Sequence, residues 1–139
     1  MLRNNRIVID TNILINAAIF PHSVPNQVLQ KALQYYQVFV SQQTLNEFIE
    51  VIRRPKFSRY FNSVVEREHF IQFFSKAVEQ IEITKTITDC QDPKDNKFLE
   101  IAIAANARLL VTGDKKDLLS MNPYRHLSII TATEFLLND

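Results

Sequence analysis

The sequence predicts an α/β domain with three layers, in which helices cover both faces of a mostly parallel β-sheet of about five strands. Short aliphatic runs alternate with segments of helical periodicity along the chain. The first run, at residues 7–9, is Ile-Val-Ile without polar alternation, which is typical of a strand buried on both faces of a parallel sheet. The 139 residues predict a single domain, 1–139, with no room for a second core.

The first half of the chain is expected to contain two strands, at 7–9 and 38–40. Helices are expected at 13–20, at 25–36 and from the end of the second strand to about residue 53. Pro21 and Pro55 end the first and third helices, because proline cannot continue a helical hydrogen-bond ladder. Pro25 stands near the start of the second helix, where proline is tolerated.

The second half is expected to contain three more strands, at 81–83 as an edge strand, at 109–111 and at 128–130. A helix at 66–78 has an apolar stripe of Phe70, Phe73, Phe74 and Ala77. Asp92 followed by Pro93 predicts the start of a further helix that runs to about residue 106. A short helix at 133–137 is the last expected element.

Composition excludes several classes of function. One glycine in the whole sequence leaves no glycine-rich phosphate loop and no dinucleotide fingerprint. One cysteine, Cys90, cannot form an internal disulfide, which is compatible with a reducing cytoplasm, and no apolar stretch is long enough to span a membrane. His22, His69 and His126 lack metal-ligand spacing and are interpreted as structural or exposed. A net charge of +1 means that any nucleic acid must be contacted by local basic patches.

Acidic residues follow two of the predicted strands. Asp10 comes directly after the first strand, and Asp114 comes two residues after the apolar run that stops at Thr112. In open α/β sheets ligands bind outside the carboxyl ends of the strands, so both acids are expected in one crevice. Gly113 predicts a tight, closely packed turn beside Asp114. Asp117 is a third candidate.

Three further acids have a structural interpretation beside the functional one. Asp92 is interpreted as a helix cap. Asp95 lies on the buried stripe of its helix, so capping and an active-site role remain equally open. Glu47 is close enough to the crevice in sequence to reach it, but its angle off the apolar stripe equally suits a solvated face.

A cluster of Asp10, Glu47, Asp95 and Asp114 would need cations to stay ionised. Carboxylate oxygens are ligands that Mg²⁺ or Mn²⁺ prefers, and these ions promote attack on a phosphodiester. Two phosphate-based alternatives fit less well. A haloacid-dehalogenase-type phosphatase needs an acid at the position of Asn12, and a receiver domain needs an acid at the position of Ile9.

Four stretches together resemble the PIN-domain ribonucleases, and in particular the bacterial PIN-family (VapC-like) toxin components of toxin–antitoxin systems. The stretches are Ile9-Asp10-Thr11-Asn12, Thr44-Leu45-Asn46-Glu47, Asp92 to Leu99 and Val111 to Leu118. Arg53 to Phe57 and Ile130 to Leu136 are also similar to that group. The resemblance covers nearly the whole chain in order.

The resemblance implies a sheet of order 3-2-1-4-5 and a metal-dependent endoribonuclease that cleaves single-stranded RNA. It implies Asp10, Glu47, Asp95 and Asp114 as catalytic ligands of Mg²⁺ or Mn²⁺. The residues that it makes supporting are Thr11, Asn12 and Thr112, with Asp117 displaced by one position. It further implies a cytoplasmic toxin, an antitoxin partner and a homodimer.

Basic residues near the expected crevice are candidates for contacts with RNA phosphates. They are Arg53, Arg54, Lys56, Lys115 and Lys116. The alternative from another class is a catalytically silent PIN-like module that binds RNA or a protein.

Overall fold

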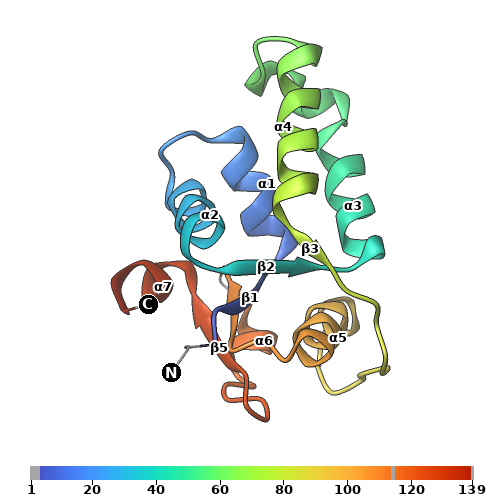
Figure 1. Ribbon diagram of the computed structural model, residues 1–139, viewed down its shortest axis with the longest axis vertical. Helices are drawn as coiled ribbons and strands as arrows, with labels where there is room; N and C mark the ends of the chain where they lie inside the picture. The colour runs from blue at the N-terminus through green and yellow to red at the C-terminus, as the bar shows by residue number, and fades with distance from the viewer. Residues whose placement is uncertain (1–3, 114, 139) are drawn as a thin grey trace.

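The computed structural model describes residues 4–113 and 115–138. Its sheet has the order β3-β2-β1-β4-β5, and every pairing is parallel. The strands are β1 (Arg6–Ile9), β2 (Gln37–Val40), β3 (Glu79–Gln80), β4 (Leu109–Thr112) and β5 (Ser128–Thr131). The predicted strand order is confirmed, and β1 occupies the centre of the sheet (Figure 1).

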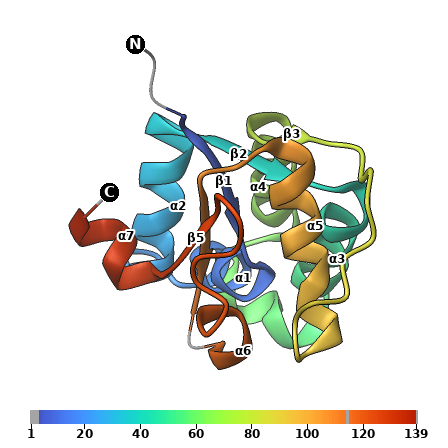
Figure 2. The same ribbon diagram turned by 90° about the horizontal axis from the view of Figure 1, so that it is seen from below.

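Helices cover both faces of the sheet, as predicted. The α-helices are α1 (Thr11–Ile19), α2 (Val24–Tyr35), α3 (Gln42–Ile52), α4 (Val64–Ala77), α5 (Asn96–Ala105), α6 (Lys116–Leu119) and α7 (Ala132–Asn138). Two 3₁₀ helices are η1 (Pro55–Tyr60) and η2 (Pro93–Asp95). Helices α1 to α4 lie above the sheet in Figure 1, whereas α5 lies below it and in front of it in Figure 2. The architecture is therefore the three-layer α/β/α arrangement.

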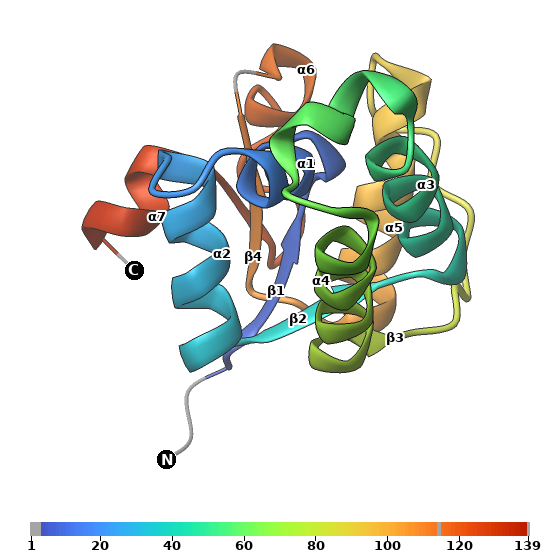
Figure 3. The ribbon, with the colours of Figure 1, turned by 90° about the horizontal axis from the view of Figure 1, so that it is seen from above.

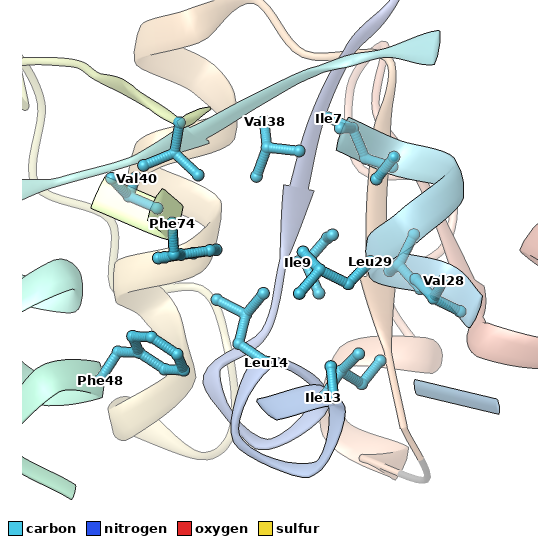
Figure 4. Close-up of a cluster of buried hydrophobic side chains, with 14 of the residues drawn as sticks. Ile7, Ile9, Ile13, Leu14, Val28, Leu29, Val38, Val40, Phe48 and Phe74 are labelled. Carbon is cyan, nitrogen blue, oxygen red and sulfur yellow. The ribbon is translucent and has the colours of Figure 1, made fainter. Parts of the chain in front are cut away.

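The core lies on both faces of the sheet because the runs at 7–9 in β1 and 109–111 in β4 are apolar at every position. Ile7 and Ile9 pack against the α1–α4 side, together with Val28 of α2 and Phe74 of α4 (Figure 4). Val8, between them, points the other way and joins the cluster under α5. All three side chains of this run are at most 3% exposed, which confirms the prediction of a strand buried on both faces.

Two details of the sequence prediction are wrong: the position of the edge strand and the buried face of α4. The edge strand is Glu79–Gln80 rather than 81–83, and Ile81 only extends it by a hydrogen bond from its backbone N–H to Val40 O. The buried stripe of α4 contains Ile71 and Phe74, whereas Phe73 is 59% exposed. No helix within residues 4–113 and 115–138 is long and apolar enough to cross a membrane.

Candidate active site

The carboxyl ends of β1 and β4 meet at Asp10, which is fully buried. One carboxylate oxygen of Asp10 accepts a hydrogen bond from the backbone N–H of Ile13 at 2.9 Å. The other accepts from the hydroxyl of Thr112 at 2.5 Å and from the backbone N–H of Gly113 at 3.2 Å. Asp10 therefore ties the end of one central strand to the end of its neighbour.

Local sequence explains why this acid tolerates burial. Asp10 is the N-cap of α1, a position that favours aspartate because its side chain satisfies a free N–H of the first turn. The positive end of the helix dipole stabilises the negative charge. The order in which strands are added to the sheet also reverses between β1 and β4, which are neighbours in the sheet (Figure 3). Open α/β sheets bind ligands at such a switch point.

The structure separates the roles of Asp92 and Asp95. Asp92 accepts a hydrogen bond from the backbone N–H of Lys94 at 3.1 Å, so the prediction of a cap is confirmed, although the capped element is η2. Asp95 occupies the N-cap position of α5, but its side chain makes no capping hydrogen bond. The buried carboxylate of Asp95 instead pairs with the ammonium of Lys115 at 2.9 Å.

The surroundings of Lys115 favour its charged form. Burial, the largest single influence, lowers the pKa of Lys115, but the hydrogen bond and the charge of Asp95 raise it. Asp10 and Asp92 add to the rise, and the pKa of Lys115 ends above its ordinary value. Lys115 is thus held as a cation between acids from different segments.

Glu47 lies in α3 and pairs with Lys97 of α5 at 2.7 Å. The Glu47 side chain is 36% exposed and also accepts a hydrogen bond from Gln43 at 3.2 Å. Helix α3 begins with a capping box between Ser41 and Thr44, which fixes the turn that precedes Glu47. Of the two interpretations of Glu47, its lining of the cleft described next supports the crevice over an isolated solvated position.

Adjoining cavities make a cleft at this edge of the sheet. The first, of about 380 Å³, is lined by Asp10, and the second, of about 310 Å³, is lined by Asp95 and Glu47. Asn12 and Lys115 line both of them. A third cavity of about 500 Å³ shares three residues with the second, namely Glu47, Lys94 and Lys97. The cleft therefore places the described acids next to lysines.

The remaining predicted acidic and turn residues are placed as follows. Asp114 lies outside the described residues. Asp117 is in α6 and lines none of the cleft cavities in the described part of the chain. Thr11 lines the second cavity. The prediction for Gly113 is wrong, because its φ is not positive and a Cβ there would meet no atom within 4 Å. Gly113 contributes a backbone N–H, not a close-packed turn.

The predicted RNA-contacting residues divide into two groups. Arg54 and Lys115 line the second cavity. Arg53 instead forms an ion pair with Glu68 of α4, and this hydrogen bond lowers the pKa of the Glu68 carboxyl. Lys56 and Lys116 are exposed, and Lys56 lies over the ring of Phe57.

Sequence reasoning missed Lys97 and Lys94, which both line the second cavity. Lys94 lies within η2 and Lys97 within the first turn of α5, where the helix dipole disfavours positive charge. That unfavourable placement is the feature of the sequence that indicates a role besides helix formation.

The donor chemistry of the cleft fits a hard divalent cation, since the candidate ligands offer carboxylate oxygens. As they stand, however, no three Asp, Glu, His or Cys residues among those described are grouped closely enough to hold a metal ion. The ammonium groups of Lys115 and Lys97 already neutralise Asp95 and Glu47. A cation that binds at this donor set would therefore compete with Lys115 and Lys97 for these carboxylates.

A doubly wound α/β domain with carboxylates at the switch point of its sheet is the class that the fold and the cleft define. The PIN domain family model matches residues 6–116. The chain belongs to the PIN domain family. This membership favours neither the phosphatase nor the receiver alternative.

Two proteins illustrate the similarity. The Uncharacterized protein MJ1680 of Methanocaldococcus jannaschii is 31% identical over 140 residues, covering 94% of this chain and 89% of that protein. The crystal structure of VapBC2 from Rickettsia felis bound to a DNA fragment from their promoter contains a chain of the same fold. The TM-score is 0.61 at 17% identity, over 91% of this chain and 98% of that chain. PIN domains are in general nucleases, and PIN nucleases typically use divalent metals, so the family supports a hydrolase.

Proposed function

We propose that this chain is a metal-dependent endoribonuclease that hydrolyses phosphodiester bonds of single-stranded RNA. The observation that supports it best is the burial of two carboxylates, Asp10 and Asp95, in adjoining cavities at the switch point of the sheet. Buried acids that line a cleft are costly for stability, which favours a functional reason for them.

Asp10, Glu47 and Asp95, with Asp114, are the proposed catalytic residues and the ligands of Mg²⁺ or Mn²⁺. Such an ion, when bound, supplies positive charge that stabilises the transition state of phosphodiester hydrolysis. Asp10 is held in one orientation by Thr112 and Gly113. We assign the positioning of the attacking water on phosphorus to this set of carboxylates.

Positive side chains on the walls of the cleft are proposed to hold the RNA backbone. Arg54, Lys94, Lys97 and Lys115 line the second cavity beside Asp95. Guanidinium and ammonium groups bind phosphate without reading base sequence, so binding is expected to weaken as salt rises. The single-stranded form suits a cleft whose individual cavities are of 310 to 500 Å³.

As the biological role we propose the toxin of a type II toxin–antitoxin pair, neutralised by an antitoxin protein and able to form a homodimer. The support is the PIN family and the fold shared with a chain of the VapBC2 complex. Co-purification of the chain with the product of a neighbouring reading frame, followed by loss of RNA cleavage in the complex, tests this role.

The activity itself is tested with purified protein and a fluorescent single-stranded RNA. Cleavage is expected with Mn²⁺ or Mg²⁺ and is expected to stop with a chelator and to return when the ion is restored. Asp10→Asn protein serves as the control for a contaminating nuclease. Cleavage that continues in chelator, or at equal rate in Asp10→Asn, overturns the proposal.

A silent binding module is the second candidate, and one observation favours it. The three proposed catalytic carboxylates that the structure describes are already paired or hydrogen-bonded: Asp10 to neutral donors, Asp95 and Glu47 to lysines. RNA that is bound but not cleaved at any Mn²⁺ concentration supports this candidate over the nuclease.

A further inference from the structure

Lys115 stands between the two cavities that contain the buried acids. It lines both the cavity of Asp10 and the cavity of Asp95. Its ammonium bonds to Asp95 at 2.9 Å, and its side chain is 29% exposed while that of Asp95 is 3% exposed. Lys115 therefore contributes to the lining of both cavities and is the ion-pair partner of Asp95.

The Asp95 carboxylate depends on this lysine. In the described part of the chain, Lys115 is the side chain that donates a hydrogen bond to Asp95. An ionised carboxylate that is buried without a partner costs several kcal/mol. Because Lys115 is the side chain that donates to Asp95, loss of this pair would leave an ionised Asp95 in need of another cation. The partner of Asp95 can be Lys115 or an ion that replaces it.

Asp10 needs no such replacement. Its oxygens are satisfied by Ile13, Thr112 and Gly113, which are neutral donors fixed by β4 and α1. The two buried acids therefore differ in what must leave before a metal ion binds.

We propose that Lys115 is an exchangeable counter-ion, which competes with the divalent ion for Asp95 and, once displaced, binds a phosphate of the RNA in the same cleft. The inference rests on the proposed function and adds a positioning role to it. The flexible four-carbon side chain of Lys115 lets its ammonium move between Asp95 and a phosphate without movement of the backbone.

The second lysine pair of the cleft has a similar arrangement with weaker coupling. Lys97 bonds to Glu47, and both residues line the second and third cavities. Both side chains are at least 25% exposed, so water screens their attraction and the exchange costs less there. Of the two ion pairs, Lys115–Asp95 is therefore the one that limits the binding of a divalent ion.

Mn²⁺ binding to RNA-free protein tests the competition, with free Mn²⁺ measured by its paramagnetic resonance signal. Lys115→Met is expected to bind Mn²⁺ about tenfold more tightly than the wild type, because the competing cation is gone. Lys116→Met is the matched control, since it removes the same charge from an exposed neighbouring residue, and is expected to change the affinity by less than about twofold. Lys115→Arg keeps the competing charge and should stay close to the wild type.

Binding of a short, nuclease-resistant phosphorothioate RNA tests the second half of the exchange. Without Mn²⁺, Lys115→Met and wild type are expected to bind it equally, because Lys115 is held by Asp95. With Mn²⁺, the variant is expected to bind it several-fold more weakly. Lys115→Gln, which can still donate a hydrogen bond to Asp95, replaces Lys115→Met in both experiments if the methionine variant does not fold.

The outcomes separate this inference from the proposed function. Equal tightening of Mn²⁺ binding in Lys115→Met and Lys116→Met overturns the exchange, because it indicates only the loss of a positive charge. Unchanged Mn²⁺ affinity in Lys115→Met, in a wild type that binds Mn²⁺ and cleaves RNA, overturns the exchange alone. Absence of Mn²⁺ binding in all variants overturns both.

Discussion

Asp10 and Asp95 are buried carboxylates at the same end of one sheet, but the groups that hold them differ. Asp10 is bonded to two backbone N–H groups and one hydroxyl, and its supports are the central strands. Asp95 is paired with a lysine. It lies in η2, which follows a segment, residues 81–92, that contains neither helix nor strand. We refer to these as the fixed end and the ionic end of the cleft.

The difference separates orientation from charge balance. Neutral donors hold a carboxylate in place but leave its negative charge in the site, whereas an ammonium cancels the charge and leaves when a stronger cation arrives. The cleft therefore combines one carboxylate of fixed orientation, Asp10, with one carboxylate whose counter-ion can be exchanged, Asp95. Variants at the two ends should therefore fail in different ways.

The largest effect is expected from Asp10→Asn at the fixed end. The amide retains the shape but loses the negative charge. Its single oxygen cannot replace both carboxylate oxygens, so it cannot accept from Ile13 on one side and from Thr112 and Gly113 on the other. RNA cleavage is expected to fall by at least about a hundredfold, and the free energy of unfolding by about 1–3 kcal/mol. A cleavage assay and a denaturant titration measure the two effects.

Asp92→Asn is the matched control for Asp10→Asn. Asp92 caps η2, so its replacement is expected to lower the free energy of unfolding by less than about 1 kcal/mol and to leave cleavage within threefold of the wild type. Equal loss of cleavage in Asp10→Asn and Asp92→Asn would contradict a specific role of Asp10 in cleavage.

Thr112→Val sharpens the same point through stability. The substitution keeps the volume of a fully buried residue and removes the hydroxyl that donates to Asp10. Loss of a hydrogen bond to a buried charge should lower the free energy of unfolding by ~2 kcal/mol. Thr133→Val, at an exposed position, should change it by less than about 0.5 kcal/mol in the same denaturant titration. Similar values for both would show that the Thr112 bond contributes little.

Cys90 reports on the ionic end, because it is buried beside η2 and its backbone N–H donates to Asn96. Burial raises the pKa of the Cys90 thiol. A backbone hydrogen bond with Asp92 lowers this pKa, whereas the negative charges of Asp95, Asp117 and Asp92 raise it further. Alkylation by iodoacetamide at pH 8 should be at least about tenfold slower than in the unfolded chain.

The pH dependence of the Cys90 reaction has a definite sign. With a pKa raised by folding, the thiol stays protonated to higher pH in the folded protein, so its stabilising effect is complete at low pH and is lost as pH rises through the folded pKa. The alkylation rate of the folded protein should continue to rise with pH beyond the ordinary thiol pKa of about 8.5, where the rate of the unfolded chain levels off. A folded-state rate equal to the unfolded rate at pH 8 would indicate that the ionic end opens freely.

The smallest effect is expected for the Glu47–Lys97 pair. A double-mutant cycle with Glu47→Gln and Lys97→Met should give a coupling energy of about 0.5 kcal/mol that decreases at high salt, because both side chains are partly exposed. The cycle with Asp10→Asn and Thr112→Val should give a larger coupling that salt does not change. Equal salt dependence in the two cycles would contradict the division of the cleft.

Strand patterns made most of the fold predictable. Apolar runs at 7–9 and 109–111 are buried on both faces, and such runs have few alternatives to a central parallel strand. The edge strand was misplaced because Glu79 and Gln80 are exposed and have no apolar pattern, whereas their pairing depends only on the backbone. Phe73 was misassigned because three phenylalanines in one helix allow more than one apolar stripe.

The candidate site was predictable where it depended on local sequence. Asp10 follows a buried strand, and Asp95 shares a helical face with apolar residues, so both could be placed inward. The lysine partners were not predictable, since Lys115 lies 20 residues from Asp95 and Lys97 lies 50 residues from Glu47. Such pairs form through the three-dimensional arrangement of α3, η2 and the end of β4.

The central position of β1 has a consequence for a chain emerging from the ribosome. Ile7 pairs with Val38 on one side and with Leu109 on the other, so β1 must wait for a neighbour that is made much later. The hydroxyl that holds Asp10 lies 102 residues further along the chain. A nascent chain without β4 therefore lacks the hydroxyl donor of Asp10, and the site is not assembled until β4 has been made.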